Sequence, residues 1–241
     1  MKKYIITTIA AIFAVLTPSN AEVTGSLEVN HTTNYTFKGQ VLDTNPTVIP
    51  KLTLKAPLVN GVSLVGSVEQ ALGTKGSTFF RSQYNAGVQV QVGSLTITPG
   101  YEVFTFPNTA GVPDTQVITL RLDLDDAGLL LAGGIHPYVD LGKGVSANTG
   151  TRAEAGIRPK FVAGKLDVAF PLAVGVSQSN YYSGYPQDVK YAYTTVGVSG
   201  EYHVTDRLSL KGLVAGYNTD TKLGNKSNNF ITTNLGVAVL F

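Results

Sequence analysis

The clearest structural signal in the chain is the run Ile118-Thr119-Leu120-Arg121-Leu122-Asp123-Leu124. Apolar residues alternate with polar ones along it, so that isoleucine and the leucines share one side and the threonine and both charges share the other. A period of two is the mark of a β-strand with two different faces. The run therefore predicts a strand that presents one face to an apolar medium and one to a polar medium.

The same alternation recurs along most of the chain, which predicts an all-β protein. Most of the segments run ten residues or more, whereas strands of globular proteins average about 5–6 residues and a tilted membrane-spanning strand needs about 9–11. The twelve predicted strands cover residues 22–38, 47–58, 61–71, 78–92, 94–106, 114–125, 129–140, 151–162, 165–177, 189–204, 207–218 and 229–241.

The connections between these strands alternate between short and long. Tight turns are expected at Asn60-Gly61, Gly93-Ser94, 126–128, Ala163-Gly164 and Thr205-Asp206, and longer polar loops at 39–46, 72–77, 107–113, 141–150, 178–188 and 218–228. This rhythm is typical of a transmembrane antiparallel up-and-down β-barrel with turns in the periplasm and loops outside. An even number of strands places both termini in the periplasm.

Charged residues keep to one face of these strands, which a barrel in lipid would require. A charge on the lipid face costs roughly 2–4 kcal/mol near the bilayer midplane. A soluble sandwich also alternates, but its strands are shorter. Each proline in a predicted strand lacks a ladder donor and weakens the strand or marks a bulge; these prolines are Pro50, Pro99, Pro137, Pro159 and Pro171.

The first residues predict a cleaved signal peptide over 1–21, followed by one barrel domain over 22–241. Lys2 and Lys3 precede an apolar core, and Ser19-Asn20-Ala21 has the small-x-small cleavage pattern.

The 241 residues include no cysteine, 43% are hydrophobic and only 14% are charged. Without Lys2 and Lys3, basic and acidic residues balance at 16 each, so the chain offers nucleic acid no basic surface. Neither a cofactor nor a metal ion is expected.

The last strand is similar to the C-terminal signal of outer-membrane barrels. A polar Asn234 is followed by Gly236, then by outward apolar positions including Val239, and the aromatic Phe241 comes last. This resemblance implies that the barrel-assembly machinery reads Phe241. Outer-membrane lipid and lipopolysaccharide are the other partners that such a location implies.

The inward face is expected to carry charges of both signs that line a pore. They are Lys51, Lys55, Glu69, Arg81, Glu102, Arg121, Asp123, Arg152, Glu154, Arg158, Lys160, Glu201 and Lys211. Twelve strands lie between filled eight-stranded barrels and open porins, so a plugged interior of ion pairs is the alternative. Basic residues outnumber acidic ones in this set, and a weak anion preference is the resulting hypothesis.

An enzyme such as an outer-membrane phospholipase is the rival class, and it would need a serine and a histidine. The chain offers His31, His136 and His203, none accompanied by a serine motif, so no catalytic residue is predicted.

Asp123, Asp125 and Asp126 could bind calcium, but aspartate is also a common turn residue, and a turn is the favoured interpretation.

The run Asn34-Tyr35-Thr36-Phe37-Lys38-Gly39, followed by Pro46, resembles the first-hairpin motif of TorF-type porins. In that family a Tyr-x-Phe-Arg-Gly stretch closes the first strand, and here Lys38 replaces the arginine. The resemblance implies an outer-membrane barrel with a channel role and supplies no substrate. The sequence as a whole predicts a porin-like channel for passive diffusion of small hydrophilic solutes, with a non-conducting structural or receptor barrel as the alternative.

Overall fold

The computed structural model describes residues 22–74, 80–107, 113–126, 133–147, 149–178, 181 and 190–241. The predicted signal peptide over 1–21 lies outside these residues, and so do parts of the predicted loops and of the predicted strand over 129–140. Within them, no helix is long and apolar enough to cross a membrane.

The described residues form one large antiparallel sheet of fourteen segments. Two pairs of segments, β10 with β11 and β12 with β13, each continue one interrupted strand, so the sheet has twelve strands. The segments are β1 (Thr24–Thr32), β4 (Thr47–Val59), β5 (Val62–Gly73), β6 (Phe80–Val92), β7 (Leu95–Thr105), β8 (Thr115–Leu124), β9 (Tyr138–Gly144), β10 (Thr151–Ile157), β11 (Lys160–Ala163), β12 (Leu166–Ala169), β13 (Leu172–Gln178), β14 (Tyr191–His203), β15 (Leu208–Thr219) and β16 (Asn229–Leu240).

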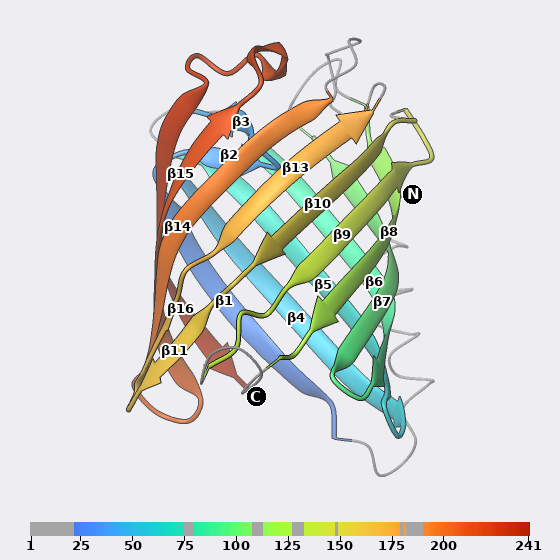
Figure 1. Ribbon diagram of the computed structural model, residues 1–241, viewed down its shortest axis with the longest axis vertical. Coiled ribbons are helices and arrows are strands. Elements are labelled where there is room, and N and C mark those ends of the chain that lie inside the picture. Colours follow the sequence, from blue (N-terminus) through green and yellow to red (C-terminus); the bar gives the residue numbers. More distant parts are fainter. Residues whose placement is uncertain are drawn as a thin grey trace.

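The sheet closes on itself, and this confirms the predicted up-and-down barrel. Each strand pairs with its neighbours in the chain, and β1 pairs with β16 from Ser26↔Leu240 to Thr32↔Asn234. The strands are tilted around the barrel wall (Figure 1). One rim carries the tight turns and the C-terminus and is called here the turn end, whereas the other carries the longer connections and is called the loop end.

The prolines mark the places where the ladders are interrupted. Pro159 separates β10 from β11, and Pro171 separates β12 from β13. Pro50 stays within β4, but the β4–β5 register passes from Val48↔Leu72 to Lys51↔Glu69 without pairing it. A proline has no backbone N–H to donate to a neighbouring strand. Pro50 keeps its pairing with β1 and loses that with β5, whereas pairs are missing on both sides of Pro171.

Three predicted strand boundaries were wrong. The strand predicted over 129–140 begins only at Tyr138, so β8 and β9 are joined by residues 125–137 and not by a tight turn at 126–128, and the described residues 133–137 are not strand. The other two boundaries concern residues 22–38 and 141–144. The predicted strand over 22–38 ends at Thr32, and residues after it form a separate small sheet of β2 (Tyr35–Phe37) and β3 (Gln40–Asp43). The residues 141–144, predicted as loop, instead continue β9 to Gly144. Both differences change what lies inside the barrel.

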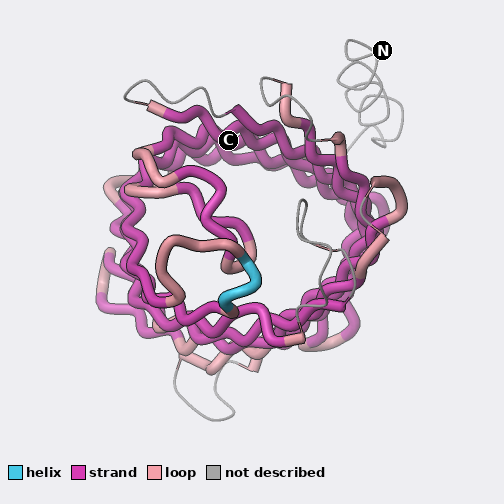
Figure 2. The backbone as a smooth tube through the Cα atoms, turned by 90° about the horizontal axis from the view of Figure 1, so that it is seen from above, coloured by secondary structure: helices cyan, strands magenta, loops and turns pink. Residues whose placement is uncertain are grey.

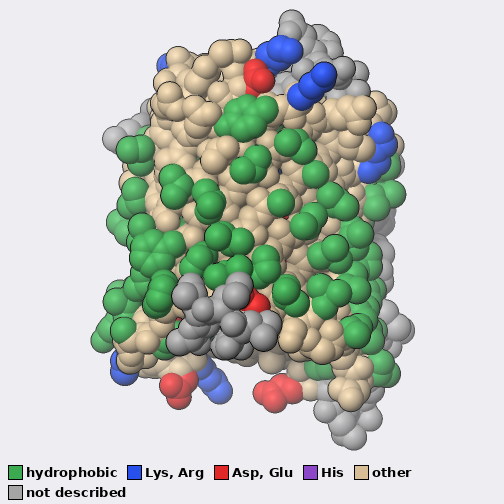
Figure 3. Space-filling view, in the orientation of Figure 1, with side chains coloured by type: hydrophobic (Ala, Val, Ile, Leu, Met, Phe, Trp, Pro, Cys, Tyr) green, Lys and Arg blue, Asp and Glu red, His purple; other side chains and the backbone are tan. Residues whose placement is uncertain are grey.

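The outer wall of the barrel is an apolar belt. Leu235 is 70% exposed, Ile231 66% and Val196 60%, and Figure 3 shows hydrophobic side chains covering the middle of the wall with charges near its rims. Burying such a side chain is worth about 1.5–3 kcal/mol, and an aqueous protein would bury many of these residues. This face is therefore one that contacts lipid.

The principal core of the protein lies inside the loop end. Seen from above, the β2–β3 hairpin and the short helix η1 (Thr221–Leu223) lie within the ring of strands (Figure 2). Their side chains join a buried cluster with residues from the wall, which comprises Phe104, Val117, Tyr181, Ala192, Tyr193 and Leu223, with Phe37, Phe106 and Tyr217 packed against it. The loop end of the lumen is thus narrowed by packed side chains.

Candidate functional site

The β2–β3 hairpin inside the barrel reverses in a turn of two residues with positive φ. Phe37 pairs with Gln40, and between them Lys38 has φ 49° and Gly39 has φ 81°. A two-residue turn with positive φ at both positions matches the twist of a tight hairpin. Gly39 is also required sterically, since a Cβ there would lie 2.7 Å from the ring of Tyr193.

Lys38 at the hairpin tip is clamped between two carboxylates of the wall. Its Nζ lies 2.9 Å from Asp140 Oδ2 on β9 and 3.0 Å from Glu154 Oε2 on β10. The lysine side chain is 19% exposed and each carboxylate 11%. Ion pairs that are this far from water are costly to break by removing one partner, so they hold the tip against this wall.

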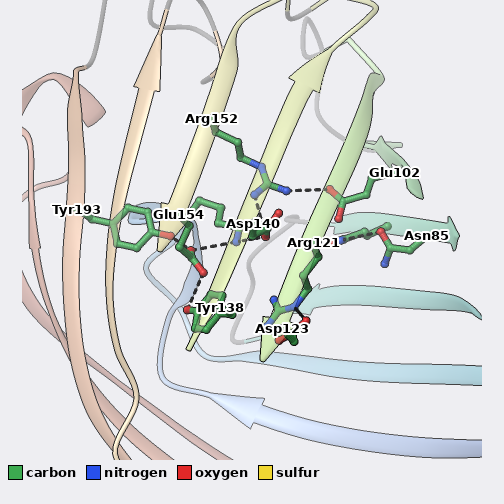
Figure 4. A network of polar contacts seen from close by, with 11 residues as sticks. Asn85, Glu102, Arg121, Asp123, Tyr138, Asp140, Arg152, Glu154 and Tyr193 are labelled. Carbon is green, nitrogen blue, oxygen red and sulfur yellow. Dashed lines mark hydrogen bonds and ion pairs between the residues drawn. The ribbon is translucent and has the colours of Figure 1, made fainter. Parts of the chain in front are cut away.

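The two carboxylates belong to a larger network, drawn in Figure 4. Arg152 Nη1 lies 2.9 Å from Asp140 Oδ2, and Arg152 Nη2 lies 3.5 Å from Glu102 Oε2 on β7. Lys38, Glu102, Asp140, Arg152 and Glu154 are called here the constriction cluster. With two cations and three carboxylates, the cluster carries a formal charge of −1.

Tyrosines support Glu154 from two sides. Tyr138 Oη donates to Glu154 Oε1 at 2.8 Å, and the Tyr193 hydroxyl donates to the other carboxylate oxygen. Since Lys38 also binds Glu154, the carboxylate is fully engaged in charge-assisted hydrogen bonds. Its position in the lumen is therefore fixed by three separate elements of the chain.

A second anchor of the hairpin is Arg81, which is 1% exposed. Its guanidinium lies 4.1 Å from the ring centre of Phe37 and 4.5 Å from that of Phe104, and it donates to the hydroxyl of Tyr35. The same hydroxyl donates to Glu69 at 3.3 Å. Arg81 and Glu69, both predicted to line the pore, thus contact the hairpin and hold it against the wall.

The η1 loop locks the hairpin from the other side. Asn225 Nδ2 donates to the Gly39 carbonyl at 2.8 Å, and Val41 N donates to Asn225 Oδ1 at 2.8 Å. These bonds join two connections that are more than 180 residues apart in the chain. The hairpin is accordingly fastened at its tip, its base and its side.

Below the constriction cluster, Arg121, Asp123 and Arg158 form a triad near the turn end. Asp123 lies 2.7 Å from Arg121 Nε and 2.8 Å from Arg158 Nη2. Both guanidinium groups lie over the ring of Tyr138, at 4.6 and 4.8 Å from its centre. The structure therefore brings these three predicted residues together with one aromatic ring.

Lys160, Glu201 and Lys211 line a cavity of about 340 Å³ in the same half of the lumen. Lys160 pairs with Asp167 at 2.7 Å, and Lys211 pairs with Glu28 at 3.1 Å and with Glu201 at 3.9 Å. Cations and carboxylates alternate around this cavity, so it is hydrophilic without a strong net charge.

Lys51 and Lys55, both on β4, stand apart from these networks. Lys51 lines a cavity of about 270 Å³ whose other walls include Glu102, Arg121 and Asp140, and Lys55 lines one of about 400 Å³ at the turn end. Among the described residues, neither lysine has a carboxylate partner within 4.0 Å. Their ammonium groups are therefore not neutralised by a carboxylate of the described residues.

Sequence reasoning missed four charged residues of the lumen, namely Glu28, Lys38, Asp140 and Asp167. Glu28 and Asp167 alternate with outward apolar residues, a signal that was present in their strands. Adding the four to the predicted set gives nine basic and eight acidic residues. The basic excess behind the hypothesis of a weak anion preference nearly disappears, and the position of individual charges becomes the stronger argument.

One histidine has neighbours of the kind found in hydrolases. His203 Nδ1 lies 3.1 Å from Ser209 Oγ, and His203 Nε2 lies 3.4 Å from Asp167 Oδ2. Ser209 is only 2% exposed and sits in the ladders with β14 and β16, so its hydroxyl is shielded from substrate. We therefore interpret His203, Ser209 and Asp167 as a hydrogen-bonded part of the barrel wall.

The aspartates near residue 125 stabilise a turn. Asp126 accepts from the backbone N–H groups of Ile135 and His136 at 2.6–3.0 Å. Burial by itself would raise the pKa of Asp126, but these hydrogen bonds outweigh it and hold the pKa below its ordinary value. Since Asp123 is engaged by two arginines, the turn interpretation accounts for these carboxylates without calcium.

The C-terminal strand closes the barrel. Gly25 and Phe241 exchange two backbone hydrogen bonds of 2.8 and 3.0 Å, while the Phe241 side chain is 57% exposed and Val239 42%. Asn234 lines the 340 Å³ cavity. Gly236 faces Asn30, whose Oδ1 would lie 2.1 Å from a Cβ at that position.

Comparisons with known proteins agree with this architecture. No family model matches the chain, and no curated protein does. Among solved structures, a KdgM porin matches 90% of this chain and 99% of its own, with a TM-score of 0.56 and 13% identity. The NanC porin matches 88% and 98%, with a TM-score of 0.57 and 12% identity. An outer membrane channel from Pseudomonas putida F1 matches 93% and 96%, with a TM-score of 0.59 and 12% identity.

The chain has the fold of a bacterial outer-membrane porin. At 12–13% identity the likeness is one of architecture, and the apolar belt is the surface that an outer-membrane location requires. The short turns then lie at the periplasmic rim and the longer loops at the outer rim. The KdgM porin has also been solved in complex with disordered oligogalacturonate, which is a property of that protein.

Proposed function

We propose that this barrel is a channel for passive diffusion of small hydrophilic solutes. The observation that carries the proposal is the position of Lys38, which is held in the lumen between Asp140 and Glu154 above cavities with polar and charged walls. A plugged barrel also has a polar interior, and the proposal is therefore supported by the cavities that remain beside the ion pairs.

The mechanism is diffusion past a charged constriction, without chemistry. A solute leaving the turn end meets Lys55 and Lys51 on β4, then the opposing carboxylates of the constriction cluster. Opposite charges on facing walls produce a field across the pore, which orients dipolar solutes and excludes apolar ones. The solutes proposed are therefore sugars, amino acids and small organic acids.

Two likenesses support this proposal. Residues 34–39 resemble the first hairpin of TorF-type porins, and here they form the hairpin that narrows the lumen. The complex of a KdgM porin with oligogalacturonate shows that a barrel of similar architecture can meet a polar saccharide. For assembly, we infer that the exposed Phe241 ring is the feature read by the barrel-assembly machinery.

Liposome swelling tests the channel. Proteoliposomes are challenged with sugars, amino acids and organic acids of graded size, with protein-free liposomes as the control. Swelling that falls as solute size rises is expected. Uptake of none of these solutes by correctly folded protein would refute the channel and leave a plugged structural barrel.

A further inference from the structure

The outer wall carries a groove that the channel does not use. It spans four neighbouring strands near the loop end, and the strand registers arrange its residues in two rows. The row nearer the rim consists of Ile118, Lys143, Thr151 and Gln178, and the row below consists of Leu120, Leu141, Ala153 and Val176. These residues, together with Lys190, are called here the outer groove.

The groove is hollow because β10 is lined with small side chains on its outward face. Ala153 lies between Leu141 and Val176, which pair with it from either side. The next outward residue of β10 is a second alanine, Ala155, which is exposed and lies just below the groove. The line of small outward side chains from Thr151 to Ala155, which starts in the groove and runs below it, is about 13 Å long at about 3.3 Å per residue, and this length accommodates much of one acyl chain.

The rim side of the groove is cationic. Lys143 and Lys190 are exposed, and no described residue of the groove is acidic. Lys143 Nζ donates to the Thr149 carbonyl at 2.5 Å, which holds the ammonium beside the groove. Three strand spacings of about 4.8 Å separate the two lysines, so they can meet separate anionic groups about 14 Å apart.

The position of these lysines relative to the apolar belt matches a lipid headgroup. Figure 3 shows basic side chains above the belt at the loop end of the face that includes β9 to β14. Thr151 and Gln178 lie between the lysines in the same row and add a hydroxyl and an amide as donors. The apolar trough is thus followed, toward the outer rim, by one row that carries both the polar side chains and the lysines.

We propose that the outer groove binds one lipopolysaccharide molecule of the outer leaflet. An acyl chain lies along Ala153 and Ala155, and phosphates of the headgroup contact Lys143 and Lys190. The source is the outer leaflet because the groove is at the loop end, and a headgroup with two phosphates fits two separated lysines better than one with a single phosphate. The inference goes beyond the channel role and is independent of it.

Native mass spectrometry of the folded barrel in detergent tests the site, with rough-type lipopolysaccharide added at increasing concentration. Removing one cation near a lipid surface weakens binding about fivefold, so each of K143Q and K190Q is expected to do so, and the double variant about 30-fold. The A153L variant fills the trough and is expected to weaken binding as well. The matched controls are K165Q, at an exposed lysine of the turn end, and A86L, at an exposed alanine of β6.

Heat-modifiable migration shows that each variant is folded before binding is measured. Unchanged lipopolysaccharide binding by the double lysine variant and by A153L would overturn the proposal. Equal binding of phosphatidylglycerol and lipopolysaccharide by the wild-type barrel would overturn the choice of lipid. Channel measurements on the same variants are expected to be unchanged, so a failure of this site is distinguishable from a failure of the channel.

Discussion

Replacing Lys38 with methionine is expected to release the hairpin that narrows the lumen. Methionine keeps most of the length of the side chain and removes the ammonium that lies 2.9 Å from Asp140 and 3.0 Å from Glu154. Removing one partner of a buried ion pair costs about 3–5 kcal/mol. Asp140 keeps Arg152 and Glu154 keeps two tyrosine hydroxyls, so the lower value applies.

A loss of about 3 kcal/mol lowers the ratio of docked to undocked hairpin about 150-fold. In planar bilayers, single-channel recordings of K38M are therefore expected to show frequent transitions to a larger conductance, whereas the wild type stays at its smaller one. K226M is the matched control, because Lys226 is exposed in the η1 loop. If folded K38M has the conductance and current noise of the wild type, Lys38 does not hold the hairpin and the reasoning fails.

Three further predictions follow from the same structure. A Gly39→Ala change places a Cβ 2.7 Å from the Tyr193 ring at a positive φ, and should displace the hairpin and raise the mean conductance. The double change K51Q/K55Q should shift the reversal potential in a salt gradient toward cation preference, and an unchanged potential would contradict the role given to β4. Asp126 has a lowered pKa, so its stabilising effect is present above the ordinary carboxyl pKa and is lost as pH falls through the lowered value. D126N should therefore lower the thermal stability of the barrel at neutral pH and make little difference in strong acid.

The barrel itself could be predicted from the sequence because contact with lipid limits the polarity of each outward side chain, independently of the rest of the chain. Charges are disfavoured on the outward face at the depth of the apolar belt, so alternation along β8 or β13 reveals both the strand and its faces. The number of strands follows from counting such segments. Even the interruptions at Pro159 and Pro171 could be anticipated, because the missing N–H is a property of proline alone.

The constriction could not be predicted in the same way, because it depends on contacts between distant residues. Lys38 forms ion pairs with Asp140 and Glu154, which lie 102 and 116 residues further along the chain. No local sequence pattern predicts contacts between residues this far apart. The end of β9 was missed for a related reason. Gly142 looks like a loop residue, but it faces inward where Arg152 crosses it, and a Cβ there would lie 2.8 Å from Arg152 Nε.

The pairing of β1 with β16 has a consequence for how the protein is made. Ser26 and Leu240 are partners in the ladder, so one edge of β1 stays unpaired until the segment that contains Leu240 is in place. Until β1 and β16 pair, the sheet has two unpaired strand edges and an exposed apolar outer face, and both favour aggregation. We therefore expect the chain to aggregate in water whenever β1 and β16 are kept from pairing.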